Sequence, residues 1–191
     1  STRVRSSAAS DVYKRQEDIC EADVVIYVIS RISGEGKDRR KVKGDYYLSE
    51  REEEDLRYLA EMNKPVILIL NAGGPVELTD ILEQTDNIKG ILNISQLGQE
   101  GGDALADVLL GKEVPGGKLT TTWARRYEDY PASEEYGYLN GNLEKEKYKE
   151  GIYVGYRYFD SFDKKVMFPF GFGLSYTCLL YTSDAADDLT R

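Results

Sequence analysis

The residue best placed to do chemistry is Glu35, which stands between Gly34 and Gly36, just past the strand-like run Asp23–Ile29. A carboxyl group that is neutral before reaction can donate its proton to a leaving oxygen. Partial burial or a nearby negative charge raises its pKa for that task. A glutamate in a loop can equally be a solvated charge, so both interpretations stay open at this point.

Three charged neighbours of Glu35 are candidates for substrate binding or for support of its loop: Arg31, Asp38 and Arg39. The adjacent Asp38 and Arg39 can orient the loop through an ion pair, although an ordinary surface pair would look the same in the sequence. The flanking glycines would let the segment approach a bulky substrate. The predicted site thus has one chemical residue and three supporting residues.

Several other chemistries are excluded or disfavoured. The chain has no histidine, so His-based triads and the usual zinc sites are ruled out, and no metal site is predicted. Gly34 and Gly36 supply two glycines of a dinucleotide fingerprint, but the third is missing. No cofactor is therefore predicted; a flavodoxin-like carrier would instead retain flavin or nucleotide on purification. Residues 71–75 either present N–H groups to an anion or form a plain strand-to-helix turn.

Glu35 must be positioned by the strand before it. The run Asp23–Ile29 is apolar after its first residue and mostly β-branched, which predicts a strand covered on both faces. Two further apolar runs, Val66–Leu70 and Ile88–Ile94, alternate with helical segments. This order predicts an α/β fold with a mostly parallel, doubly wound sheet sandwiched by helices. Ligand sites in such sheets collect at the carboxyl ends of strands, where Glu35 stands.

The helices carry their own start and stop signals. Ser49 is a predicted N-cap, Glu52 completes a capping box, and Asn63-Lys64-Pro65 ends that helix. Shorter helices are predicted at Glu17–Ala22, Val76–Glu83 and Asp103–Leu110.

The last third is rich in aromatic residues and glycine, especially in Gly151–Phe159 and Val166–Tyr176. These stretches predict an irregular, extended tail that wraps the sheet and supplies an antiparallel edge. The aromatic side chains either stack on sugar rings or seal a sheet face or a neighbouring domain. They are Tyr153, Tyr156, Tyr158, Phe159, Phe168, Phe170 and Phe172.

Size and charge set the broad class. The chain has 191 residues, 41% of them hydrophobic, and a net charge of −9, which predicts one domain with a sizeable core. A strongly acidic domain repels phosphate backbones, so no nucleic-acid partner is expected. No apolar run reaches the roughly 20 residues of a membrane span, so no membrane partner is expected either. The compartment stays open between bacterial cytoplasm and secretion, with no signal peptide visible.

The two ends of the chain read as foreign. Residues 1–16 and 178–191 lack periodicity and resemble translated sequencing-adapter read-through; disordered native tails are the alternative. We therefore expect a non-native leader at 1–16, the folded domain at 17–177 and a non-native tail at 178–191.

Five motifs, in order, resemble glycoside hydrolase family 3, the group of β-glucosidases and β-xylosidases. The segment from Arg31 to Arg39 is similar to the family's acid/base loop. The other four are Asn71–Glu77, Gly98–Gly102 with Ala106–Gly111, Pro115–Thr120, and Gly151–Phe159 continuing through Phe168–Thr177. They span most of 17–177 and resemble the α/β sandwich domain, incomplete at its start. Asn93 and Leu97 depart from the aromatic residue and proline found in many members.

The resemblance implies a site shared by two domains. Glu35 matches the general acid/base, whereas the aspartate nucleophile would come from a missing (β/α)-barrel of the same protein, in a retaining mechanism. It implies a fragment of an exo-β-glycosidase, expected to be a β-glucosidase acting on a β-linked glucoside or oligosaccharide, and inactive in isolation. A non-catalytic α/β carbohydrate-binding or interaction module is the alternative.

Overall fold

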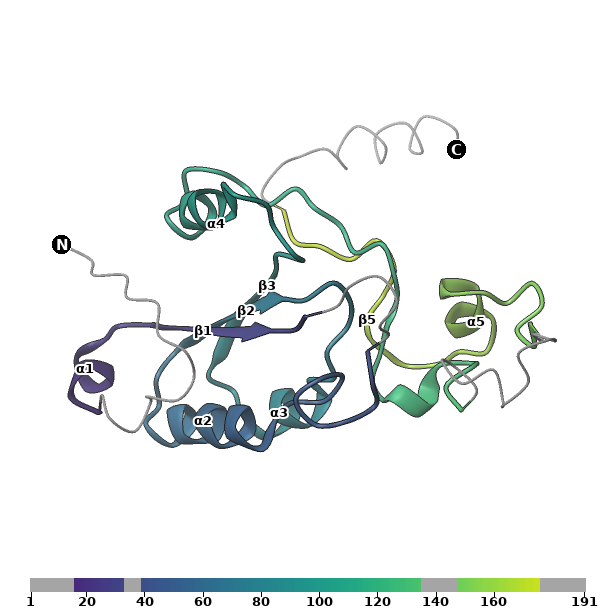
Figure 1. Cartoon of the computed structure of the whole chain (residues 1–191), viewed down its shortest axis with the longest axis horizontal. Helices are drawn as coiled ribbons and strands as arrows, with labels where there is room; N and C mark the ends of the chain where they lie inside the picture. Colours follow the sequence, from purple (N-terminus) through teal and green to yellow (C-terminus); the bar gives the residue numbers. More distant parts are fainter. Residues whose placement is uncertain (1–15, 33–38, 135–147, 176–191) are drawn as a thin grey trace, which may run out of the picture.

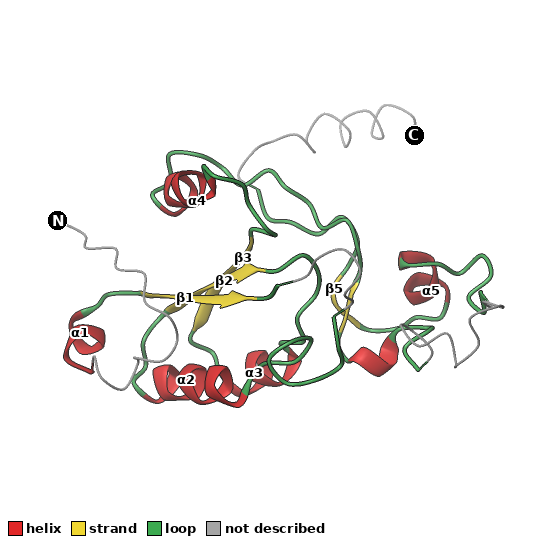
Figure 2. Cartoon of the chain, viewed as in Figure 1, coloured by secondary structure: helices red, strands yellow, loops and turns green. Residues whose placement is uncertain are grey.

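The computed structural model describes residues 16–32, 39–134 and 148–175. Helices and strands alternate through the first part of the chain (Figures 1 and 2). They are α1 (Gln16–Glu21), β1 (Val25–Ser30), α2 (Glu50–Glu61), β2 (Val66–Asn71), α3 (Thr79–Gln84), β3 (Ile88–Asn93) and α4 (Gly101–Leu109). The later part holds β4 (Trp123–Ala124), a 3₁₀ turn at Tyr127–Asp129, α5 (Tyr156–Ser161) and β5 (Val166–Phe168).

Among the described residues, β1, β2 and β3 form a three-stranded parallel sheet in the order β1-β2-β3. Tyr27 is level with Leu68 and Ile29 with Leu70, which aligns the carboxyl ends of β1 and β2. Parallel neighbours need crossover connections, and α2 and α3 provide them. The predicted α/β class with a parallel sheet is therefore confirmed.

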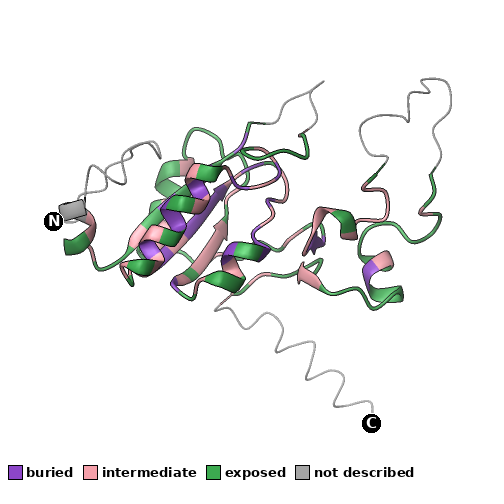
Figure 3. Ribbon diagram, turned by 90° about the horizontal axis from the view of Figure 1, so that it is seen from below, coloured by how far each residue is buried: buried purple, intermediate pink, exposed green. Residues whose placement is uncertain are grey.

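The main core lies between the sheet and the α2–α3 side (Figures 1 and 3). Leu56 and Leu59 of α2 are buried, as are Leu68 and Leu70 of β2. The predicted capping box is present, because Ser49 Oγ accepts a hydrogen bond from the N–H of Glu52 and the Glu52 side chain accepts one from the N–H of Ser49. This local signal fixes where α2 begins, and so which of its residues face the sheet.

Among the described residues, the predicted cover of β1 is complete on one face and incomplete on the other. Tyr27 and Ile29 are buried, but Val24, Ile26 and Val28 on the opposite face are 43%, 42% and 49% exposed. In Figure 1, α4 lies on that side of the sheet, yet α4 has no buried residue. An unbroken run of apolar residues therefore indicates that both faces of the strand are suited to burial, but only one of them is fully buried here.

The tail contains more regular structure than its sequence predicts. The strands β4 and β5 pair with each other in an antiparallel ladder, separate from the parallel sheet. The predicted antiparallel edge on the main sheet is thus not formed by these strands. α5 interrupts the stretch expected to be extended, and its Phe159 is buried. The ring of Trp123 on β4 meets that of Phe168 on β5 edge to face at 5.9 Å, which holds the small sheet together.

Candidate functional site

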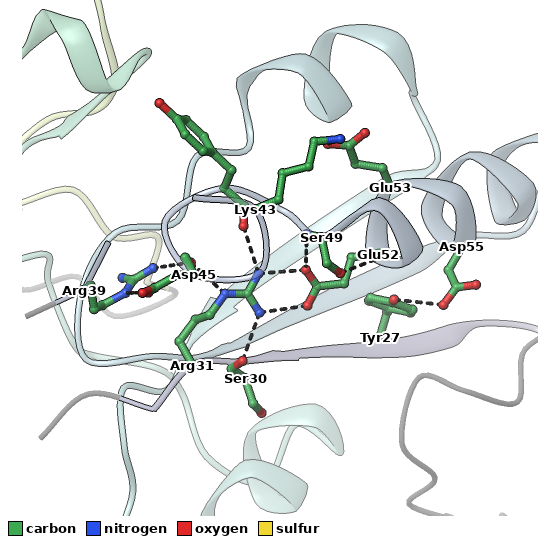
Figure 4. Close-up of polar contacts among 11 residues, drawn as sticks. Tyr27, Ser30, Arg31, Arg39, Lys43, Asp45, Ser49, Glu52, Glu53 and Asp55 are labelled. Atoms are coloured by element: carbon green, nitrogen blue, oxygen red, sulfur yellow. Dashed lines mark hydrogen bonds and ion pairs between the residues drawn. The ribbon is translucent and has the colours of Figure 1, made fainter. Parts of the chain in front are cut away.

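The predicted site lies just past the carboxyl end of β1. Glu35 and Asp38 fall outside the described residues, so the structure places neither of them. Arg31 and Arg39 are described, and they stand on the two sides of that segment. The geometry of the site is therefore that of the two arginines and their partners (Figure 4).

Arg31 is buried, with 6% of its surface exposed. Its guanidinium forms a bidentate ion pair with Glu52, with Nη1 2.8 Å from Oε1 and Nη2 2.7 Å from Oε2. Its other N–H groups donate to backbone carbonyls: Nε to Asp45 (2.7 Å), Nη1 to Ser30 (2.9 Å) and Nη2 to Tyr47 (3.3 Å). An arginine side chain has five N–H donors. All five are used within the chain, so Arg31 can bind a substrate only by breaking one of these bonds.

Glu52 reaches Arg31 from the first turn of α2. Its Oε2 also accepts a hydrogen bond from the N–H of Ser49 at 2.8 Å. Burial by itself raises the pKa of Glu52, but the hydrogen bonds from Arg31 and from the Ser49 N–H outweigh it, and the pKa lies below its ordinary value of 4.5. Glu52 is therefore ionised at neutral pH, and its pair with Arg31 is a buried, charge-assisted contact.

Arg39 is held by Asp45 and by the turn that follows β2. Its Nε donates to Asp45 Oδ1 at 3.0 Å, and its Nη1 donates to the carbonyl of Pro75 at 2.6 Å. The guanidinium carbon also lies 5.9 Å from the centre of the Tyr46 ring, which is a cation–π distance. Arg39 is thus fixed on more than one side.

Asp45 connects the two arginines. Its carbonyl oxygen accepts from Nε of Arg31 and from Nη2 of Arg39, at 2.7 and 2.5 Å, and its Oδ2 accepts from the N–H of Arg40 at 2.7 Å. Burial raises the pKa of the Asp45 carboxyl, but the Arg40 N–H and the Arg39 guanidinium outweigh it and leave the pKa below its ordinary value of 3.8. The segments before and after residues 33–38 therefore both form hydrogen bonds with one residue, Asp45.

The turn after β2 packs against this cluster. The carbonyl of Asn71 accepts from the N–H of Arg31 at 3.0 Å, and a Cβ at Gly74 would lie 3.7 Å from Nη1 of Arg39. α3 begins only several residues later, so the turn does not aim N–H groups from a helix start. These contacts support the plain-turn interpretation of 71–75 over an anion site.

The aromatic residues of the tail divide between their two interpretations. Phe159 is buried and Phe168 packs against the core, as expected of rings that seal a face. Tyr156 and Phe170 stack on each other at 5.1 Å while staying exposed. An open hollow beside them is lined by Ile152, Tyr153, Tyr156, Arg157, Asp160 and Ser161. Sugar stacking stays a prediction for the exposed rings.

Two members of the cluster, Asp45 and Glu52, were not among the predicted site residues. The sequence gives a signal for Glu52 as a helix cap, but none for its pairing with Arg31, which is 21 positions away. Asp45 uses its backbone carbonyl, an acceptor that every residue carries, so its residue type could not reveal the contact.

No group of three or more Asp, Glu or Cys residues within the described ranges is arranged to hold a metal ion. Of the helices in the described ranges, none combines the length and apolarity that a membrane span requires.

Comparison with known proteins identifies the relatives of the chain. Residues 4–156 match the family model for the glycosyl hydrolase family 3 C-terminal domain. Beta-glucosidase A of Butyrivibrio fibrisolvens is 38% identical over 203 aligned residues, covering 89% of this chain and 24% of that protein. A beta-glucosidase of Ruminococcus albus is also 38% identical, covering 82% of this chain and 16% of that protein. The chain thus spans a quarter or less of these relatives.

Solved structures give the same result. Beta-glucosidase 3B of Thermotoga neapolitana, in complex with glucose, superposes with a TM-score of 0.75 and 44% identity, covering 90% of this chain and 24% of that one. A beta-glucosidase of Paenibacillus barengoltzii superposes with a TM-score of 0.76 and 36% identity, covering 84% of this chain and 17% of that one. The fold described above is therefore that of one domain within these larger proteins.

Proposed function

The chain belongs to glycosyl hydrolase family 3, and we propose that it is the C-terminal α/β domain of a retaining exo-β-glycosidase, a β-glucosidase. The observation that carries the proposal is the family match over residues 4–156, joined to relatives that are named beta-glucosidases. The matched range begins inside the stretch predicted as a leader, and the domain bounds 17–177 stay a prediction. The proposed substrate is a β-linked glucoside or oligosaccharide.

In this proposal the two carboxyl groups of the reaction come from two domains. Glu35 donates a proton to the glycosidic oxygen while an aspartate on a (β/α)-barrel of the same protein attacks the anomeric carbon. The aglycone leaves as an alcohol and the sugar stays bound to the aspartate as an ester. Glu35, now a carboxylate, takes a proton from the water that hydrolyses this ester, and both carboxyl groups return to their starting states.

The arrangement around 33–38 supports a positioned loop. All five N–H donors of Arg31 bind Glu52 or backbone carbonyls. This favours a role for Arg31 in supporting the loop over direct contact with the substrate. Arg39 is bound to Asp45 and is assigned the same task. Asp38 is proposed to support the loop as well.

The proposal is tested in the rejoined enzyme, which we define as this chain expressed in frame with the barrel from its own reading frame. Glu35→Gln removes the acid and the base but keeps the shape of the side chain. We expect kcat/KM on an aryl β-glucoside with a poor leaving group to fall by about 100- to 10,000-fold. On a glucoside whose leaving group needs no proton, azide should restore turnover and give a β-glucosyl azide, because azide attacks the ester without a general base.

Glu54→Gln is the matched control, since Glu54 is an exposed residue of α2, and it should leave both rates unchanged. The chain alone should show no hydrolysis above buffer. Activity that survives Glu35→Gln would remove Glu35 from the reaction, and clear hydrolysis by the chain alone would contradict the two-domain site. A rejoined protein that binds glucosides without hydrolysing them would instead favour the non-catalytic module.

A further inference from the structure

We infer that Asp45 and Glu52 are positioning residues that hold the two ends of the Glu35 segment at a fixed separation. The inference rests on the proposed function, because it assigns these residues a task in placing the general acid/base. It is carried by the network in Figure 4, in which both arginines flanking 33–38 bind the same residue, Asp45.

Arg31 and Arg39 share one hydrogen-bond acceptor. One carbonyl oxygen, that of Asp45, receives Nε of Arg31 and Nη2 of Arg39. Arg31 follows β1 directly, and Arg39 is where the described chain resumes. The separation of the two ends is therefore set through a single peptide group.

The shared acceptor is itself held in place by hydrogen bonds within its turn. The Asp45 N–H donates to the carbonyl of Val42 at 3.2 Å, and Gly44 donates to Tyr47 at 3.0 Å within the same turn. Gly44 has φ +81°, a left-handed conformation that suits glycine. The carboxylate of Asp45 also holds the N–H of Arg40. The hydrogen bonds of this turn therefore hold the Asp45 carbonyl in a fixed position.

The cluster is also bound to helix α2. Glu52 binds Arg31 with both carboxylate oxygens and stands in the first turn of α2, whose Leu56 and Leu59 are buried against the sheet. Its orientation is further set by Ser49. The end of β1 is therefore bound to a helix that packs on the sheet, as well as to the turn that contains Asp45.

The consequence for the reaction is geometric. A general acid acts only when its proton lies within hydrogen-bond reach of the leaving oxygen, and a displacement of about 1 Å costs up to about 100-fold in rate. Loss of the hydrogen bonds made by Asp45 or Glu52 should therefore slow the step that needs proton donation more than the other steps of the reaction. A general loss of structure would reduce every rate by the same factor, which gives the experiment its discriminating power.

The test uses the rejoined enzyme and two aryl β-glucosides, a phenyl glucoside that needs proton donation and a dinitrophenyl glucoside that does not. For Asp45→Ala and Glu52→Gln, we expect kcat/KM to fall about 10- to 100-fold on the phenyl glucoside. On the dinitrophenyl glucoside it should fall by less than about threefold. Asp80→Asn is the control, because it breaks a carboxylate–arginine pair with Arg126 away from this cluster, and both rates should be unchanged.

Both Asp45 variants keep the backbone carbonyl, and Asp45→Ala removes only the carboxylate that accepts from Nε of Arg39 and from the N–H of Arg40. Asp45→Asn is measured in parallel, because it keeps one side-chain oxygen as an acceptor and so provides a milder variant if Asp45→Ala does not fold. Its loss on the phenyl glucoside should lie between those of the wild type and Asp45→Ala. Equal losses on the two glucosides in folded variants, or no loss on either, would overturn the inference. Failure of the proposed function gives a different result, namely a silent Glu35→Gln in the same assay.

Discussion

The guanidinium of Arg31 shows how a buried charge is kept in this fold. A charge removed from water is tolerated only when a counter-charge and further hydrogen bonds replace its hydration. Glu52 supplies the counter-charge, and the carbonyls of Ser30, Asp45 and Tyr47 supply the rest. Because the partners come from separate segments, a change at any one of them is felt by the whole cluster.

Glu52→Gln should therefore destabilise the isolated chain in a pH-dependent way. At neutral pH it leaves the buried charge of Arg31 without its counter-charge, and the free energy of unfolding should fall by about 3 kcal/mol. The folded-state pKa of Glu52 lies below 4.5, so the stability that its charge contributes is fully present above that pH and is lost as the pH falls further. The gap between wild type and variant should thus shrink from about pH 7 to about pH 3.5.

Urea denaturation of both proteins at the two pH values measures this gap. Asp80→Asn serves as the control, because its pair with Arg126 is more exposed and exposed pairs contribute about 0–1 kcal/mol. A gap for Glu52→Gln that stays constant with pH would show that the ionised carboxylate is not what stabilises the cluster.

The elements depend on backbone conformation as well as on side chains. α5 begins after Gly155, whose φ of 60° and ψ of −131° lie in a region that essentially only glycine adopts. No heavy atom outside its immediate chain neighbours would lie within 4 Å of a Cβ at this position. The requirement for glycine at 155 is therefore conformational and not steric.

Gly155→Ala should lower the free energy of unfolding by about 1–3 kcal/mol, because alanine is strained in this conformation. Gly102 in α4 is the matched control, since it has no positive φ and its Cβ would also meet nothing within 4 Å. Gly102→Ala should raise stability by about 0.5 kcal/mol through helix propensity. Urea midpoints of the two variants measure the contrast, and a neutral Gly155→Ala would mean that the turn before α5 relaxes freely.

Across the whole molecule, the sequence was informative where the cause of a structure is local. The pairing of Ser49 with Glu52 spans three residues, so the capping box and the start of α2 could be predicted from spacing alone. The three apolar runs predicted the three strands of the parallel sheet, because each run is long and apolar. The order of the strands within the sheet was not predicted.

Features that depend on distant contacts could not be predicted in this way. The ion pair of Arg31 with Glu52 and the shared carbonyl of Asp45 need the sheet and α2 in place before they exist. Likewise, the helix at 156–161 follows from the unusual backbone of Gly155 and the burial of Phe159, which no periodicity in that aromatic stretch reveals. The role of Glu35 as general acid/base was inferred from the order of the family's sequence motifs, and it stays a prediction.

How far each face of β1 is buried also depends on distant contacts, so the sequence alone could not predict it. Ile26 and Val28 are exposed here, whereas Ile29 on the opposite face is fully buried. Ile26→Thr and Val28→Thr keep a β-branched side chain, so each should change the free energy of unfolding by less than about 0.5 kcal/mol. Ile29→Thr should cost about 2–3 kcal/mol, because it places a hydroxyl in the core and leaves a gap.

Apolar side chains that lie side by side on an exposed face, such as those of Ile26 and Val28, also bind hydrophobic dyes. The double variant Ile26→Thr/Val28→Thr should therefore bind less anilinonaphthalene sulfonate than the wild-type chain at equal stability, measured by dye fluorescence in native buffer. Leu110→Thr is the control, since Leu110 is a single exposed residue at the end of α4, and its dye binding should match the wild type. If either β1 substitution proved as costly as Ile29→Thr, that face would have to be covered in solution, and the exposure described for Ile26 and Val28 would be wrong.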